Sequence, residues 1–287
     1  WTETLLKECF KSWGSRNNNH GFMDGLTLHY YTVPTGVWDA KGSATDFDDK
    51  LWYKTLAKTL VIDEYISKHS AIMDRYDPEK QIGLMVDEWG TWYDVEPGTN
   101  PGFLYQQSTI RDALVAGINL NIFNKHCDIV KMANIAQLVN VLQSVILTDG
   151  EKMIKTPTYH VFKMYKYHQG ATLLGSDLLE NGTVGEGKNE LPKVFESVSE
   201  DENGVITITL TNNSLDSEEK VDVAFVLDGD KYSVCDSSIV TGAMNAYNTF
   251  ENAENVKEEK FDAFSKTDKG IAVTLPKCSV VMLRLKK

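Results

Sequence analysis

Two adjacent acids followed by aromatic residues form the part of the sequence best suited to chemistry. Residues 82–86 are apolar or small, a pattern typical of a short strand buried on both faces in a parallel sheet, and Asp87 and Glu88 follow directly. A buried carboxylate is costly unless it is paired or used, and parallel α/β folds build active sites at the carboxyl ends of their strands. Glu88 is therefore a candidate for one of the two carboxylates that a glycosidase needs.

The aromatic residues beside Glu88 extend this interpretation, while a plainer one stays open. Trp89, Trp92 and Tyr93 would give a ligand a stacking wall. In the alternative, Asp87 caps a helix, Glu88 is solvated and the tryptophans belong to the core. Because side chains alternate along a strand, we expect Asp87 to point away from Glu88, where it would support or pack rather than bind substrate.

Three predicted strands position such side chains at their ends. Each is followed by a loop and a helix, which indicates βα units in a parallel sheet. The predicted strands cover residues 23–32, 82–86 and 117–123, and the predicted helices cover residues 50–76, 103–116, 129–147 and 158–168. The first and third strands end in the polar or aromatic residues His29, Tyr30, Tyr31, Asn124, Lys125 and His126. We expect the three tips to converge on one face, as in a (β/α) barrel.

The pattern changes after Gly170, where short, nearly alternating segments are separated by Gly, Asn and Asp. This pattern predicts an antiparallel β-sandwich. The predicted strands cover residues 171–179, 193–199, 205–212, 220–227, 231–237, 271–275 and 279–285, and residues 245–260 are predicted to form a long surface loop. The domains are thus expected at 1–170 and 171–287.

Composition argues against several other classes of protein. The net charge of −12 disfavours a nucleic-acid or anionic-membrane partner, and no apolar run approaches the roughly 20 residues that span a bilayer. Cysteines and histidines lack the spacing of metal sites, so neither a metal nor another cofactor is expected. We expect Cys127 and Cys278 to be buried, while a disulfide between Cys235 and Cys278 stays open.

Three segments resemble glycoside hydrolase family 51, which consists mainly of α-L-arabinofuranosidases. They are residues 28–31 (LHYY), 86–93 (VDEWGTWY) and 130–141 (VKMANIAQLVNV), within a match that covers roughly residues 1–174. The resemblance implies a retaining mechanism on a (β/α)8 barrel, with Glu88 as the nucleophile at the tip of strand seven. It also implies that Tyr31 contacts the nucleophile or the sugar, and that Trp92 lines the substrate pocket.

Two further residues are substrate-binding candidates by the same resemblance. His29 corresponds to the histidine of strand six, and Gln137 corresponds to a glutamine near the bound arabinose. Each has a simpler interpretation, as a hydrogen-bonded strand-tip histidine and as a solvent-facing helix residue.

The sequence departs from the family pattern in lacking the acid/base motif, Gly-Asn-Glu. The Asn189-Glu190 pair follows Lys188 instead of glycine and falls in the predicted sandwich. The resemblance places Trp1 after strand five, so we expect strands six to eight of a TIM barrel followed by the sandwich. Three strands cannot close a barrel, so the expected partner is a missing N-terminal half. The isolated chain should be inactive without its acid/base glutamate.

The expected substrate is an arabinose-containing oligosaccharide or polysaccharide, and the family commonly forms homo-oligomers. Two alternatives remain: a β-1,4-glucan endohydrolase of the same family, and a non-catalytic carbohydrate-binding fragment. Arabinan versus arabinoxylan preference, exo versus endo action and compartment stay open, with the cytoplasm favoured.

Overall fold

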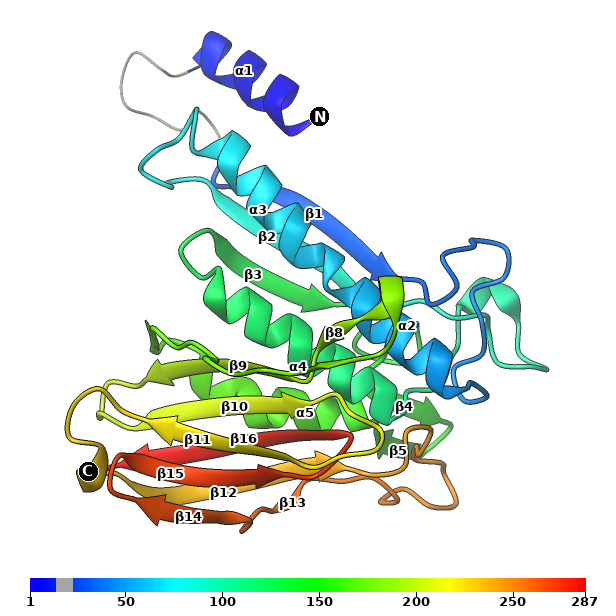
Figure 1. Ribbon diagram of the computed structural model, residues 1–287. Coiled ribbons are helices and arrows are strands. Elements are labelled where there is room, and N and C mark those ends of the chain that lie inside the picture. Colours follow the sequence, from blue (N-terminus) through cyan, green and yellow to red (C-terminus); the bar gives the residue numbers. More distant parts are fainter. Residues whose placement is uncertain (14–22) are drawn as a thin grey trace.

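A three-stranded parallel sheet carries the candidate carboxylates. The computed structural model describes residues 1–13 and 23–287. The sheet has the order β1-β2-β3, formed by Gly25–Thr32, Gly83–Thr91 and Val130–Ile135 (Figure 1). The predicted parallel pairing is present, and β2 continues beyond the apolar run, so the two acids lie inside the strand.

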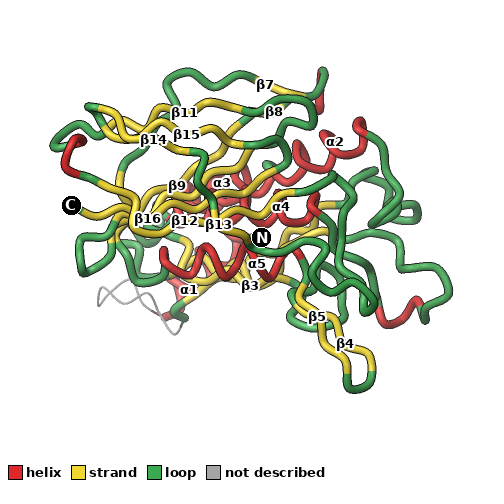
Figure 2. Tube along the Cα trace, turned by 90° about the horizontal axis from the view of Figure 1, so that it is seen from below, coloured by secondary structure: helices red, strands yellow, loops and turns green. Residues whose placement is uncertain are grey.

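The third strand was predicted in the wrong place. Residues 117–123 belong to helix α4, Ile110–Lys125, in which 13 of the 16 residues are buried. A helix buried on nearly all sides has no polar stripe, so its alternating apolar residues resemble a strand. The helix predicted over residues 129–147 is also wrong, because this segment contains β3, a loop and the start of a hairpin. That hairpin, β4 (Ile146–Asp149) and β5 (Lys152–Lys155), projects from the body in Figure 2.

Helices cover one face of the parallel sheet. The segment predicted as one helix is two, α2 (Asp49–Thr59) and α3 (Val61–Met73), which meet at Leu60. The Asp48 side chain caps α2 by accepting a hydrogen bond from the Leu51 amide at 2.8 Å. The remaining helices are α1 (Thr2–Trp13), which packs against α3, and α5 (Pro157–Tyr165), which packs against α4.

The predicted antiparallel sandwich is confirmed. A six-stranded sheet with the order β13-β12-β16-β10-β9-β6 faces a three-stranded sheet with the order β11-β15-β14, and an apolar core lies between them. The strands are β6 (Thr172–Leu174), β9 (Val194–Glu200), β10 (Ile206–Asn212), β11 (Glu219–Ala224), β12 (Ser233–Thr241), β13 (Glu259–Lys260), β14 (Phe264–Thr267), β15 (Gly270–Leu275) and β16 (Ser279–Lys286). A short ladder joins β7 (Thr183–Val184) to β8 (Leu191–Pro192).

Helix α4 forms the layer between the parallel sheet and the sandwich. It packs on β2 and β3 on one side and on β9, β10 and β16 on the other (Figure 1). Hydrogen bonds join α4 to the sandwich, because Asn121 Oδ1 accepts from Ser197 Oγ at 2.8 Å and from Thr209 Oγ1 at 2.7 Å. One hydrophobic core therefore runs from β2 through α4 to β16.

The cysteines differ partly from expectation. Cys278 is buried as predicted, but Cys127 is exposed just after α4, and neither Cys235 nor Cys278 is in a disulfide. Within residues 1–13 and 23–287, no helix is both long enough and apolar enough to cross a membrane.

Candidate active site

A bulge in β2 places both acids on the same face of the sheet. Thr27 pairs with Met85 but His29 pairs with Glu88, so β2 has one residue more than β1 over this interval. His29 Nε2 lies 3.1 Å from Asp87 Oδ1, and His29 Nδ1 lies 3.5 Å from Glu88 Oε2. The prediction that Asp87 points away from Glu88 is therefore wrong, because a bulge interrupts the alternation of side chains.

Tyr31 and Glu88 are joined directly. The tyrosine hydroxyl donates a 2.7 Å hydrogen bond to Glu88 Oε2. His29 and Tyr31 are two residues apart on β1 and so share a face. Burial, and then the hydrogen bond and the negative charge of Glu88, raise the pKa of Tyr31. The hydroxyl thus stays protonated and remains a donor at neutral pH.

Trp92 lies beside this pair. Its ring centroid is 4.9 Å from that of Tyr31 in an edge-on arrangement, and its backbone amide donates to the carbonyl of Thr32 at 3.0 Å. The structure thus brings together Glu88, Tyr31, His29 and Trp92, all at the carboxyl ends of β1 and β2.

Gln137 is placed differently from the other candidates. It lies in the loop after β3, not on a helix, and its side chain is exposed. The preceding residue, Ala136, donates its amide to the carbonyl of Trp89 at 2.9 Å, which holds this loop against the end of β2. Gln137 is thus near the strand that carries Glu88, but its side chain makes none of the contacts that join Glu88, Tyr31 and His29.

A buried polar network beneath the end of β2 was not predicted. Asp112 Oδ1 accepts from Thr91 Oγ1 at 2.6 Å and from the hydroxyl of Tyr93 at 2.8 Å. Asp112 also forms a capping box with Thr109 at the start of α4. Desolvation by burial is the largest cause of the raised pKa of Asp112. The Thr-x-x-Asp spacing was the available signal for this helix start.

Gln143 and Gly90 complete the support of this strand end. Gln143 Oε1 accepts from the Thr91 amide at 2.8 Å, and Nε2 donates to the Asp112 carbonyl at 2.9 Å. Gly90 has φ +138°, and a Cβ there would lie 3.2 Å from Gln143 Oε1. A glycine is therefore needed for Gln143 to approach the backbone of β2.

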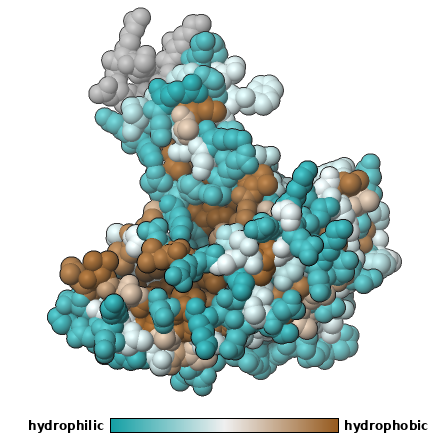
Figure 3. All heavy atoms as spheres, viewed as in Figure 1, coloured by the Kyte–Doolittle hydropathy of each residue, from teal (hydrophilic) through white to brown (hydrophobic). Residues whose placement is uncertain are grey.

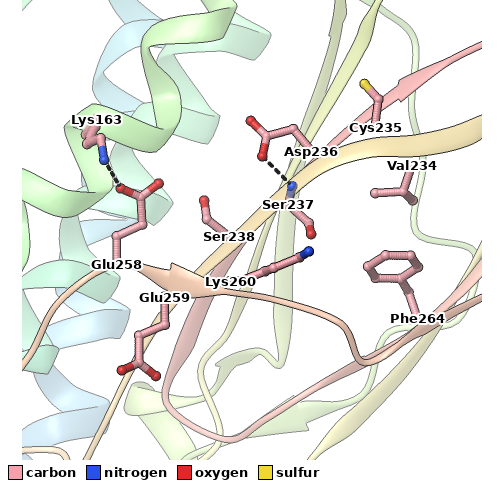
Figure 4. Close-up of a pocket in the computed structure, with 10 residues that line it drawn as sticks. All are labelled: Lys163, Val234, Cys235, Asp236, Ser237, Ser238, Glu258, Glu259, Lys260 and Phe264. Atoms are coloured by element: carbon pink, nitrogen blue, oxygen red, sulfur yellow. Dashed lines mark hydrogen bonds and ion pairs between the residues drawn. The ribbon is translucent and has the colours of Figure 1, made fainter.

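A pocket elsewhere in the molecule is not lined by Asp87 or Glu88. It lies on β12 and β13 beside α5, and its lining includes Lys163, Asp236 and Glu258 (Figure 4). Lys163 is paired with Glu258 at 2.6 Å. Among the residues that the structure describes, no cluster of three His, Cys, Asp or Glu side chains could hold a metal ion.

Comparison with known proteins identifies relatives of this chain. The model of the alpha-L-arabinofuranosidase C-terminal domain matches residues 87–279. An intracellular exo-alpha-L-arabinofuranosidase of Bacteroides ovatus is 45% identical, over 99% of this chain and 53% of the relative. An exo-alpha-(1->6)-L-arabinofuranosidase of Bifidobacterium longum is 25% identical, over 76% of this chain and 41% of the relative.

A solved structure extends the likeness to the fold. The crystal structure of the GH51 arabinofuranosidase from Xanthomonas axonopodis pv. citri superposes with a TM-score of 0.89 and 44% identity, over 100% of this chain and 55% of that one. The chain thus spans about half the length of the relatives it matches. Because the domain model covers most of the chain and the fold agrees throughout, the chain belongs to glycoside hydrolase family 51 and contains the C-terminal domain of its alpha-L-arabinofuranosidases.

Proposed function

We propose that this chain supplies the nucleophile of a retaining α-L-arabinofuranosidase that releases terminal arabinofuranosyl residues. The observation that carries the proposal is the hydrogen bond from Tyr31 to Glu88 Oε2, at the carboxyl ends of two adjacent parallel strands. Both this contact and that of His29 fall on Oε2. The other oxygen, Oε1, is therefore the one available to attack a substrate.

The proposed reaction has two displacements. Glu88 Oε1 bonds to the anomeric carbon while the glycosidic C–O bond breaks, and a carboxylic acid protonates the leaving oxygen. The resulting carboxylate then removes a proton from water, which attacks the same carbon and releases Glu88. Two inversions retain the configuration. Tyr31 keeps the carboxylate oriented throughout, and Trp92 offers its ring to the sugar.

The acid/base glutamate is proposed to come from outside residues 1–287. Asp87 and Glu88 both pair with the imidazole of His29. This pairing suits Asp87 to holding His29 in position. A complementary segment would therefore supply the proton donor, and this chain alone would be inactive.

That segment is proposed to complete a (β/α)8 barrel in which β1, β2 and β3 are strands six to eight. Within the described residues, β1 and β3 each pair only with β2 in this sheet. Beside β3 lies a hollow of about 720 Å³ whose lining includes Ile135, Leu138 and Phe162. Hydrophobic side chains also gather where the upper part of the molecule meets the body below (Figure 3). Open strand edges and exposed apolar surface favour covering by further strands and helices.

The mode of action and the compartment are proposed from a relative. The Bacteroides ovatus protein is named an intracellular exo-acting enzyme, which supports exo action and a cytoplasmic location here. Arabinan and arabinoxylan are the polysaccharides with suitable terminal units. We also propose that the barrel part ends near Gly170, that the assembled enzyme is a homo-oligomer, and that Gln137 approaches the sugar once the site is complete.

Reconstitution tests this function. The chain is combined with the part of the Bacteroides ovatus relative that precedes the matched region, and release of arabinose from α-1,5-linked arabinotriose is measured. Activity should depend on both pieces. Glu88→Gln should lower kcat by at least ~10⁴-fold, because a neutral amide cannot form the glycosyl-enzyme.

Glu64→Gln is the matched control, since Glu64 lies on α3 and pairs with Lys68. It should leave turnover unchanged. Full activity of the Glu88→Gln complex would refute the nucleophile assignment. Hydrolysis of a soluble β-1,4-glucan in place of the arabinotriose would refute the substrate.

A further inference from the structure

The loop between β1 and α2 presents an exposed tryptophan beside the candidate site. Trp38 is 57% exposed, and its ring centroid lies 4.8 Å from that of Trp92. Trp92 in turn contacts Tyr31, which bonds Glu88. A continuous series of aromatic rings therefore leads from the carboxylate outward to the surface.

This loop is held in place by hydrogen bonds from its surroundings. The Asp94 carboxylate accepts from the amides of Lys41 at 3.1 Å and Gly42 at 3.0 Å, and the Asp94 amide donates to the Gly42 carbonyl at 3.0 Å. Arg111 Nη2 donates to the carbonyl of Ser43 at 3.0 Å. An exposed indole on a fixed backbone is preorganised, so a ligand that contacts it has little ordering entropy to overcome.

Lys41 adds a hydrogen-bond donor to the aromatic surface. Its Nζ lies 4.5 Å from the Trp38 ring centroid and 5.7 Å from that of Trp92, and it donates to the Trp38 carbonyl at 2.6 Å. An ammonium carries three N–H donors, so others remain for a ligand. A sugar ring offers an apolar C–H face and several hydroxyls, which match an indole and an ammonium placed side by side.

We propose that Trp38 and Lys41 bind the sugar unit that adjoins the terminal arabinofuranosyl residue. This inference rests on the proposed function, in which the terminal unit occupies the position at Glu88. When a terminal residue is released, every further unit of the substrate lies on the leaving-group side. Trp38, two ring contacts away from the Tyr31–Glu88 pair, then selects oligosaccharides over single sugars and small arabinosides.

Saccharide titration of this chain tests the surface, because Trp38 and Lys41 and the residues that hold them all belong to it. Isothermal titration calorimetry compares α-1,5-linked arabinotriose with arabinose. The trisaccharide should bind the wild-type chain about tenfold more tightly, as expected for one stacked aromatic contact. Trp38→Ala should remove most of this difference, Trp38→Phe should keep a large part, and Lys41→Met should remove a smaller part.

Trp1→Ala is the matched control, because Trp1 is an exposed tryptophan too but directly precedes α1, which packs against α3 (Figure 1). It should leave both affinities unchanged. Equal binding of arabinotriose by the wild-type chain and Trp38→Ala would overturn the proposal, as would a wild-type chain that binds the two saccharides equally. The proposal would also be overturned if Trp38→Ala changed only the self-association of the chain, measured by ultracentrifugation, and left saccharide binding unchanged. The Glu88 turnover test does not depend on these results, so the two proposals fail separately.

Discussion

At the residue scale, the contacts of Glu88 are one-sided. Tyr31 and His29 both approach Oε2, while Asp87 lies on the opposite nitrogen of the same imidazole. The carboxylate is thus held by one oxygen and can present the other. Because the raised pKa of Tyr31 keeps its hydroxyl protonated, the orientation of Glu88 is not lost when the pH rises above neutrality.

Removing the Tyr31 hydroxyl should impair the reaction more than binding. In the reconstituted enzyme we expect Tyr31→Phe to lower kcat by about 10–100-fold with little change in KM, since a hydrogen bond to a charged group contributes about 1.5–3 kcal/mol. Tyr30→Phe is the control, because the Tyr30 hydroxyl donates to the Lys58 carbonyl in the helix layer. A Tyr31→Phe enzyme with wild-type kcat would show that the hydroxyl does not orient the nucleophile.

The sequence predicted which residues lie near Glu88 better than it predicted the side of the strand to which each side chain points. The polar and aromatic ends of β1 and β2 marked Glu88, Tyr31, His29 and Trp92, which lie together in the structure. The side taken by Asp87 was not predictable, because a bulge depends on the pairing of two strands. Trp38 gave no periodic signal, since it lies in an irregular loop.

At the element scale, the end of β2 is fixed from below by α4 and Gln143. Thr91 donates both its amide and its hydroxyl into this network, three residues after Glu88. A strand end held at several points keeps the preceding residues in place, so the network transmits the rigidity of the core to the carboxylate.

Gly90→Ala tests how tightly this strand end is packed. The new Cβ would crowd Gln143 at a φ that L-residues rarely adopt, so we expect the free energy of unfolding to fall by about 2–4 kcal/mol. Gly98→Ala is the control, because Gly98 also has a positive φ of 83° but has open space around it. It should cost about 1 kcal/mol. Equal losses in urea unfolding would show that packing against Gln143 is unimportant.

Segments with alternating apolar and polar residues were assigned correctly as strands, whereas a helix buried on nearly all sides was not assigned as a helix. Strands β9, β10, β15 and β16 of the sandwich were predicted to within one residue of their observed bounds, whereas β14 was not predicted. Helix α4 contacts protein on almost every side, and without a polar stripe its sequence has no helical period to detect. The error at α4 displaced the third strand and the helix assigned to Gln137.

At the scale of the whole molecule, the parallel sheet has two strands with an unpaired edge within the described chain. The chain spans about half the length of its relatives, and the complementary segment proposed above would pair these edges. Which apolar side chains of β3 become buried could not be predicted from residues 1–287, because the residues of the proposed segment determine it.

Assembly with that segment should be measurable apart from catalysis. Adding it should raise the melting temperature of this chain by mass action. Leu138→Asp should weaken association by at least tenfold, because Leu138 is 65% exposed here and would be desolvated in a closed barrel. Leu179→Asp, at a 94% exposed position in the sandwich part, should have no effect. If both substitutions act alike, the hollow beside β3 is not the assembly surface.

The position of α4 determines where the sandwich can be separated from the rest of the chain. The six-stranded sheet packs on α4. Asn121 of this helix accepts hydrogen bonds from the hydroxyls of Ser197 on β9 and Thr209 on β10. A fusion module cut at residue 171 would leave those hydroxyls and the adjoining apolar side chains facing solvent, and would be prone to aggregate. A sandwich domain used in another protein must therefore include residues 110–125, because α4 packs against both the sandwich and the parallel sheet.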